Sequence, residues 1–159
     1  MEALIGIDKK HKTEISDALN IVLADQHILY IKLRNYHWNI EGNSFLELHE
    51  FLEKLYTGME KDIDETAERI RKIGKNPMGS CSEFLEFTNL KETKEPFHDS
   101  HKILSTLLDD YEVIIRWIRD HVDVAADNRD YGTEDFMVGL IRNYEEASWM
   151  LRAYLAKSK

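Results

Sequence analysis

The sequence contains little cysteine, little proline and no long apolar run, and each absence excludes a class of protein. A single cysteine, Cys81, among 159 residues excludes an intrachain disulfide framework and fits a reducing compartment. No apolar run reaches the roughly 18 residues that a membrane-spanning helix needs, and no basic start followed by an apolar stretch predicts secretion. We therefore expect one cytoplasmic domain of ordinary size that builds its core without disulfides.

The charge balance is acidic, with 30 Asp and Glu residues against 21 Lys and Arg residues and a net charge of -9. This balance favours solubility, attracts cations and opposes unaided binding to nucleic acid. Basic residues near the ends form only short groups, Lys9-Lys10-His11-Lys12 and Lys157 with Lys159. We expect no tight DNA binding at physiological salt, and association with the nucleoid is kept as an alternative location.

The hydrophobic pattern is helical almost throughout, and strand signals are nearly absent. Only two prolines occur, and both fall between helical segments. The pattern predicts long helices over 13–36, 44–73, 96–125 and 133–155 and a short amphipathic piece over 83–87. The expected starts are Thr13, Ser44 with Glu47 as a capping box, Ser82, Pro96 and Thr133, and the second helix is expected to stop at Gly74.

These elements predict an all-α fold, a four-helix bundle with a short extra helix in its long middle connection. Residues 1–159 are expected to form a single domain, with 1–12 as a flexible N-terminal tail.

Five metal-ligand candidates fall into register on this helical pattern: His37, which precedes Trp38-Asn39, followed by His49, Glu53, Asp64 and Glu68. Imidazole and carboxylate together suit iron, zinc or manganese. Two i, i+4 pairs separated by eleven residues, close to three turns, share one helix stripe. One such pair is typical of a solvated charged face, but the register of the whole set favours a metal site.

The length of that stripe decides how the ligands can meet. At about 1.5 Å of rise per residue, the midpoint of His49 and Glu53 lies roughly 22 Å from that of Asp64 and Glu68. Two metals that share ligands lie only about 3.5–4 Å apart, so one chain cannot close the site alone. If the same helix of a second copy packs antiparallel, a twofold dimer acquires two identical sites. We therefore predict a metal site shared between subunits.

Longer runs around these ligands resemble a known family. They are Asn35-Tyr36-His37-Trp38-Asn39-Ile40-Glu41-Gly42-Asn43-Ser44-Phe45, Leu48-His49-Glu50 and Asp64-Glu65-Thr66-Ala67-Glu68-Arg69, together with 82–87 and 149–155. Over nearly its whole length the chain resembles the Dps family, the DNA-binding proteins from starved cells or mini-ferritins of the ferritin-like superfamily. The resemblance implies a ferritin-like bundle with its small helix in the middle loop.

The resemblance also implies an activity. His37, His49, Glu53, Asp64 and Glu68 fall on the family's iron ligands, which lie across a subunit dimer. Many members have aspartate where Glu53 stands, and the extra methylene alters its reach toward the second metal. The implied function is oxidation of Fe(II) by hydrogen peroxide or oxygen, storage of ferric oxide in a hollow dodecamer and protection from oxidative damage. Zinc and manganese are potential substitutes for iron on these ligands.

Trp38 stands where the family has a tryptophan beside the centre, thought to take up oxidising intermediates. The alternative is a packed interface aromatic.

The family admits iron through negatively charged threefold pores, lined from the region between the last two long helices. Asp127, Asp130 and Asp135 are the candidates for such a pore here. Helix capping and loop solvation are the alternative explanation for these acids.

Two other functions stay open from the sequence. A ferritin-like protein with an intrasubunit metal site needs Glu-x-x-His on two helices, and only Glu95-Pro96-Phe97-His98 fits, at a helix start. A non-redox scaffold or nucleoid-associated bundle would not need the ligand register. His98 with His101, and His27 with Asp25, have no assigned role.

Overall fold

The computed structural model describes residues 3–94 and 98–156, and every regular element in this part of the chain is a helix. The helices are α1 (Lys9–Asn39), α2 (Phe45–Lys72), α3 (Cys81–Phe87), α4 (Ser100–Asp127) and α5 (Tyr131–Leu155). The predicted all-α bundle of four long helices, with a short helix in the middle connection, is confirmed. None of the described helices is both long and apolar enough to cross a membrane.

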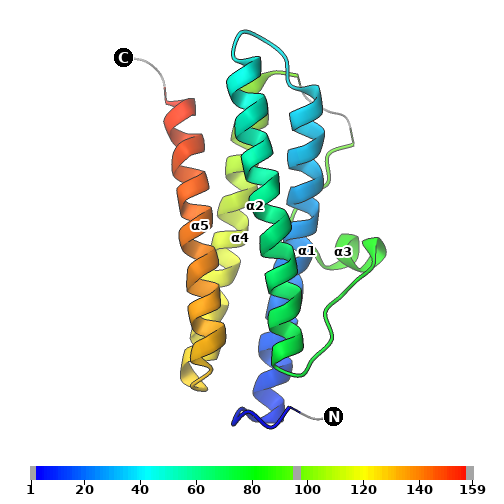
Figure 1. The fold of residues 1–159 in the computed structure, drawn as a ribbon, viewed down its shortest axis with the longest axis vertical. Coiled ribbons are helices and arrows are strands. Elements are labelled where there is room, and N and C mark those ends of the chain that lie inside the picture. Colours follow the sequence, from blue (N-terminus) through cyan, green and yellow to red (C-terminus); the bar gives the residue numbers. More distant parts are fainter. Residues whose placement is uncertain (1–2, 95–97, 157–159) are drawn as a thin grey trace.

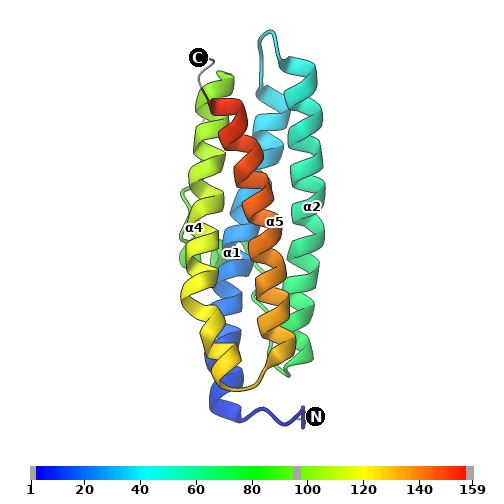
Figure 2. The same cartoon turned by 90° about the vertical axis from the view of Figure 1, so that its left-hand side faces the viewer.

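The four long helices lie side by side, and α3 lies across the outside of the bundle (Figure 1). In that view α1 and α5 run upward and α2 and α4 run downward, so the connection that carries α3 returns the chain from bottom to top. α1 packs against α2 and α4, and α4 packs against α5, whereas α2 and α5 touch sparingly. The α1–α2 turn and the α4–α5 turn therefore lie at opposite ends (Figure 2).

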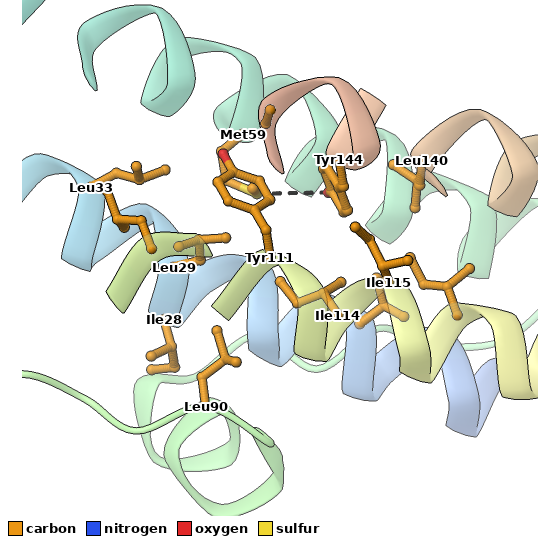
Figure 3. Close-up of a cluster of buried hydrophobic side chains, with 14 of the residues drawn as sticks. Ile28, Leu29, Leu33, Met59, Leu90, Tyr111, Ile114, Ile115, Leu140 and Tyr144 are labelled. Atoms are coloured by element: carbon orange, nitrogen blue, oxygen red, sulfur yellow. Dashed lines mark hydrogen bonds between the residues drawn. The ribbon is translucent and has the colours of Figure 1, made fainter. Parts of the chain in front are cut away.

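Apolar side chains from the four long helices fill the centre of the bundle (Figure 3). Burial recurs at the helical period that the sequence predicted, because one stripe of each helix faces the other three. Buried examples from α1, α2, α4 and α5 are Leu29, Leu33, Met59, Ile114 and Leu140. Phe45, the first residue of α2, is an exception to this pattern and is 43% exposed.

Two tyrosines carry polar groups into this core. The rings of Tyr111 and Tyr144 lie 5.6 Å apart between centroids. The Tyr144 hydroxyl accepts a hydrogen bond from Gln26 Nε2 (2.8 Å) and donates one to Met59 Sδ (3.7 Å), the latter drawn in Figure 3. Because buried polar groups are costly unless they are paired, these bonds fix how α1, α2 and α5 pack together.

The start of α1 differs from the predicted start because another side chain caps it. Asp8 has an extended backbone and accepts a hydrogen bond from the His11 amide (2.9 Å), so the helix begins at Lys9 rather than Thr13. Thr13 lies inside the helix, where its hydroxyl donates a hydrogen bond to the Lys9 carbonyl (3.1 Å). Residues 9–12 of the expected tail are therefore helical.

The starts of α2 and α4 also differ from expectation. Ser44 precedes α2, but its side chain makes no capping hydrogen bond, so the predicted capping box with Glu47 is wrong. A residue that caps a helix with its side chain typically has an extended backbone, and the Ser44 backbone (φ -99, ψ 23) is not extended. α4 begins at Ser100 after Asp99, whose carboxylate accepts a hydrogen bond from the Lys102 amide. The predicted start at Pro96 lies outside the described residues.

Two more caps are corrected in the same way. Ser80, rather than Ser82, caps α3 and forms a capping box with Glu83. Asp130, rather than Thr133, caps α5, which starts two residues earlier than predicted. The predicted end of α5 near residue 155 is confirmed.

The end of α2 is confirmed at Gly74. This glycine has φ +87, in the region that disfavours residues with a Cβ atom. Its amide bonds to the Arg71 carbonyl (2.9 Å), and the Lys75 amide bonds to the Ile70 carbonyl (3.0 Å). A Cβ atom at this position would lie only 2.8 Å from the Cβ of Ala3. The N-terminal segment therefore closes directly on this turn.

α3 is tied to α1 by a buried carboxylate and a ring contact. Asp25 accepts hydrogen bonds from the Thr88 hydroxyl (2.7 Å) and from the backbone amide (2.6 Å) and Nδ2 (3.0 Å) of Asn89. Burial raises the pKa of Asp25, and these hydrogen bonds oppose the rise. His27 stacks on Phe84 at 3.9 Å between centroids. The role of Asp25 and His27, unassigned from the sequence, is thus structural.

Asp62 of α2 gives a prediction about pH. Burial raises the pKa of its carboxyl from 3.8 to about 6, although the nearby Tyr144 hydroxyl acts to lower it. Between these values the folded chain binds more protons than the unfolded chain, so stability falls as pH rises through that window. We expect Asp62→Asn to leave stability nearly unchanged at pH 4 and to raise it by on the order of 1–2 kcal/mol at pH 7.5, after discounting for partial solvent contact.

Urea-unfolding midpoints of wild type and Asp62→Asn at the two pH values measure this effect. Glu60→Gln is the matched control, since Glu60 is an exposed acid of the same helix. A gain from Asp62→Asn that is the same at both pH values would contradict the assignment.

Candidate metal centre

His37 at the end of α1 and His49 near the start of α2 face each other. Their rings stack with centroids 3.7 Å apart and an interplanar angle of 20°. Nδ1 of His37 lies 2.8 Å from the His49 carbonyl oxygen, and Nδ1 of His49 lies 2.9 Å from the His37 carbonyl oxygen. A carbonyl oxygen only accepts, so each Nδ1 carries the proton and donates. This reciprocal pairing leaves both Nε2 lone pairs available to a metal.

The short connection between α1 and α2 creates this pairing. The Ile40 amide bonds to the Tyr36 carbonyl (2.9 Å) and closes α1, and the Phe45 amide bonds to the Gly42 carbonyl (3.1 Å) as α2 begins. Gly42 has φ +114, a value that favours glycine. Because the chain reverses within five residues, the two histidines meet although they are twelve positions apart.

The predicted carboxylates lie along the exposed side of α2. Glu53 follows His49 by about one turn, whereas Asp64 and Glu68 lie near the far end of the helix, and all three are exposed. Glu68 pairs with Lys72 of the next turn (2.9 Å). Within residues 3–94 and 98–156, no three His, Cys, Asp or Glu side chains come close enough together to hold a metal. The chain by itself therefore joins His37 with His49 and leaves Asp64 and Glu68 apart from them.

A cluster of one cation and three aromatic rings adjoins the histidine pair. It consists of Arg34, Tyr30, Trp38 and Tyr56 and is called the Arg34 cage below. Arg34 Cζ lies 5.6, 5.0 and 5.7 Å from the ring centroids of Tyr30, Trp38 and Tyr56. Trp38 is nevertheless 63% exposed in the single chain. Such contacts fix ring positions through the attraction between a cation and a π face.

Tyr56 connects the cage to the candidate ligands. Its ring meets the His37 ring edge to face, with centroids 5.2 Å apart. Loss of solvent contact raises the pKa of Tyr56, as do the charge and hydrogen bonding of Glu53, while Arg34 lowers it. The phenol therefore stays protonated at neutral pH and can donate to a carboxylate.

Several large apolar side chains of α1, the start of α2 and α3 are exposed in the single chain. Apolar side chains that gather into a patch on a protein surface are typical of protein–protein interfaces. The exposed large apolar side chains of these elements are Ile31, Trp38, Phe45, Leu46, Leu85 and Phe87.

The three acids predicted to line a pore are not equivalent. Asp127 and Asp135 are exposed, but Asp130 is only 3% exposed. Asp130 accepts hydrogen bonds from Arg69 Nη2 (2.9 Å) and the Thr133 hydroxyl (2.7 Å). The expectation that Asp130 faces a pore is therefore corrected: its carboxylate is a buried structural group that caps α5 and binds α2.

Two other groups of residues weigh against the alternative functions. His11 and Lys12 of the basic run are buried, and Lys12 Nζ donates to the Ala3 carbonyl, so the run is not a free basic arm. Lys157 and Lys159 lie outside the described residues. His98 is an exposed side chain whose Nδ1 lies 2.7 Å from the Asn39 carbonyl oxygen and 3.4 Å from a Glu41 carboxylate oxygen. Because it lies on the surface, it does not support a metal site inside the bundle.

The Arg34 cage was missed from the sequence. Tyr30, Arg34 and Trp38 recur every four residues and so share one side of α1, which was an available signal. Tyr56 joins them only through the packing of α2 on α1, and no local pattern shows that contact.

The chain is similar in sequence and in structure to known proteins. The model of the ferritin-like domain family matches residues 16–159. The chain is 38% identical over 152 residues to a low temperature-induced protein of Nostoc sp., covering 95% of this chain and 85% of that one. It is 34% identical over 142 residues to DNA protection during starvation protein 2 of Bacillus anthracis, covering 89% of this chain and 97% of that one. The crystal structure of a Dps protein from Vibrio cholerae, a ferritin-like diiron-carboxylate protein, matches with a TM-score of 0.93 at 36% identity, covering 98% and 97% of the two chains.

Proposed function

We propose that this chain, which belongs to the Dps family of ferritin-like proteins, oxidises Fe(II) with hydrogen peroxide at sites shared between two subunits and stores the ferric product inside an oligomeric shell. Membership of the family supports iron storage and protection as its role. The observation that carries the proposal is the His37–His49 pair, whose reciprocal hydrogen bonds leave both Nε2 atoms free for a metal.

The proposed ligands divide the chemistry between them. His37 and His49 hold Fe(II), because imidazole suits a borderline cation, and Glu53 with the partner subunit's Asp64 and the partner subunit's Glu68 supplies harder oxygen ligands that stabilise Fe(III). Two Fe(II) ions give two electrons to one hydrogen peroxide molecule. Its O–O bond breaks to yield two hydroxide ions and two Fe(III) ions, so the reaction consumes both reagents of hydroxyl-radical formation.

A twofold dimer is the assembly that completes this site. The histidine pair and the Asp64–Glu68 pair lie at opposite ends of α2, so an antiparallel second α2 brings unlike ends together. The exposed apolar side chains of α1, α2 and α3 give such a dimer an area to bury. Six dimers would make the proposed dodecamer, with Asp127 and Asp135 retained as the proposed pore acids. Zinc or manganese could occupy the same ligands.

Anaerobic loading with Fe(II), followed by addition of hydrogen peroxide, tests the activity. We expect ferric absorbance to appear faster than with free iron, and His37→Ala to slow the protein-dependent rate by more than about tenfold, because loss of a direct ligand costs at least as much as loss of a residue that supports one. Stopped-flow absorbance on size-fractionated oligomer measures the rate.

His101→Ala is the matched control, since His101 is exposed and is not a proposed ligand. It should oxidise iron at the wild-type rate. A wild-type rate no greater than that of free iron would remove the ferroxidase proposal and favour the non-redox scaffold. We propose no direct DNA binding, because the acidic chain holds part of its basic run in the bundle.

A further inference from the structure

Tyr56 lies between two of the proposed ligands. Its ring contacts the His37 ring edge to face at 5.2 Å between centroids. It follows Glu53 by three residues on α2, so both side chains project from the same side of the helix and the phenol is within reach of the Glu53 carboxylate. Glu53 itself is exposed and takes part in none of the ion pairs formed within residues 3–94 and 98–156. Tyr56 is therefore the residue placed to orient Glu53.

The Arg34 cage holds Tyr56 in this position. The Tyr56 ring meets Tyr30 edge to face at 6.2 Å, and Arg34 Cζ lies 5.7 Å from its centroid. Arg34 in turn donates a hydrogen bond from Nη1 to the Tyr30 hydroxyl (3.1 Å). Three side chains of α1, His37 among them, thus fix a ring that belongs to α2. A ring fixed on several sides gives its hydroxyl a defined position.

We propose that Tyr56 is a positioning residue of the metal centre, which orients the Glu53 carboxylate toward the second metal ion. This inference rests on the proposed function. Glutamate has one more side-chain torsion than aspartate, and fixing that torsion on metal binding costs conformational entropy. A hydrogen bond from a rigid phenol restricts the carboxylate before the metal arrives, as groups around metal ligands commonly do. Tyr56 thereby allows the longer Glu53 to act as a ligand.

Titration of the assembled protein with Co(II), which is stable to air and absorbs in the visible range, tests this role. We expect wild type to bind in two steps, and Tyr56→Phe to weaken the second step by about tenfold while leaving the first unchanged. Phenylalanine keeps the ring and its contacts with His37 and Arg34. Tyr154→Phe is the matched control, because it removes the same hydroxyl from an exposed position on α5.

Combination with Glu53→Gln shows whether Tyr56 acts through Glu53. If it does, the double variant Glu53→Gln/Tyr56→Phe binds Co(II) no more weakly than Glu53→Gln alone. Additive losses, or a second step in Tyr56→Phe equal to that of wild type, would overturn the inference and leave the proposed function intact. Wild-type Co(II) binding that is absent, or that persists unchanged in His37→Ala, would overturn the proposed function together with this inference. Elution as the wild-type oligomer checks that each variant assembles.

Discussion

A His37→Ala/His49→Ala chain mixed with an Asp64→Ala/Glu68→Ala chain is expected to oxidise Fe(II), although neither chain does so alone. Each site of the proposed dimer takes its histidines from one subunit and its distal carboxylates from the other. A heterodimer of the two variants therefore contains one site with every ligand and one site with none of these four. Random pairing makes half of the dimers heterodimers, so the mixture should recover about a quarter of the wild-type sites.

A second mixture provides the control for this experiment. Wild type mixed equally with a chain carrying all four substitutions should also keep about a quarter of the sites, because every heterodimer site lacks one half of its ligands. If each chain instead closed its own site, this mixture would keep about a half and the first mixture would recover nothing. Dissociation and reassembly have to be verified by exchange of tagged chains, and confirmed exchange without recovery would refute the shared site.

The sequence predicted the helices well and their starts poorly, for a physical reason. Burial on one face repeats every helical turn over a long helix, so residues such as Leu48, Leu52 and Met59 report their orientation many times over. A cap depends instead on the backbone conformation of a single residue before the helix. Aspartate and threonine are both favourable capping residues. Asp8 has the required conformation, whereas Thr13 lies inside the helix.

The candidate site likewise contains residues that a sequence pattern reveals and residues that only the fold brings in. Four of the ligand candidates recur at helical intervals on one helix, which makes them recognisable as a set: His49, Glu53, Asp64 and Glu68. His37 lies on the preceding helix, and its reciprocal hydrogen bonds with His49 leave both Nε2 atoms free, while the role of these residues as ligands stays a prediction. Tyr56 belongs to the site only because α2 packs on α1. Its partner Arg34 belongs to a different helix, and contacts between helices leave no fixed interval in the sequence.

Asp130 shows the same limit among the acids between α4 and α5. Asp127 and Asp130 are the same residue type and both lie near the connection between α4 and α5, so the sequence alone does not distinguish them. What separates them is Arg69, which lies 61 residues earlier, in α2, and reaches Asp130 in the folded bundle. Arg129, the residue before the cap, has φ 59 and is the one described residue other than glycine with a positive φ. The hydrogen bonds of Asp130 hold the chain in this otherwise unfavourable turn.

Replacement of Asp130 by alanine is therefore expected to destabilise the fold strongly. The substitution removes the partner of Arg69, the side-chain cap of α5 and the acceptor of the Thr133 hydroxyl, and it leaves the buried His11 ring without its neighbouring carboxylate (3.7 Å). Loss of one member of a buried ion pair costs about 3–5 kcal/mol, and we expect about 3 kcal/mol because Arg69 keeps some solvent contact.

Urea unfolding followed by circular dichroism measures this cost, with Asp127→Ala as the matched control. Asp127 is an exposed acid at the end of α4, and its loss should change stability by no more than about 0.5 kcal/mol. A similar small change in Asp130→Ala would mean that the carboxylate is not structural, and the pore assignment would then return. Asp130→Asn separates the two contributions, because the amide oxygen can still cap α5 but carries no charge. If Asp130→Asn is as stable as wild type, the cap alone accounts for the loss in Asp130→Ala, and the ion pair with Arg69 contributes no net stability.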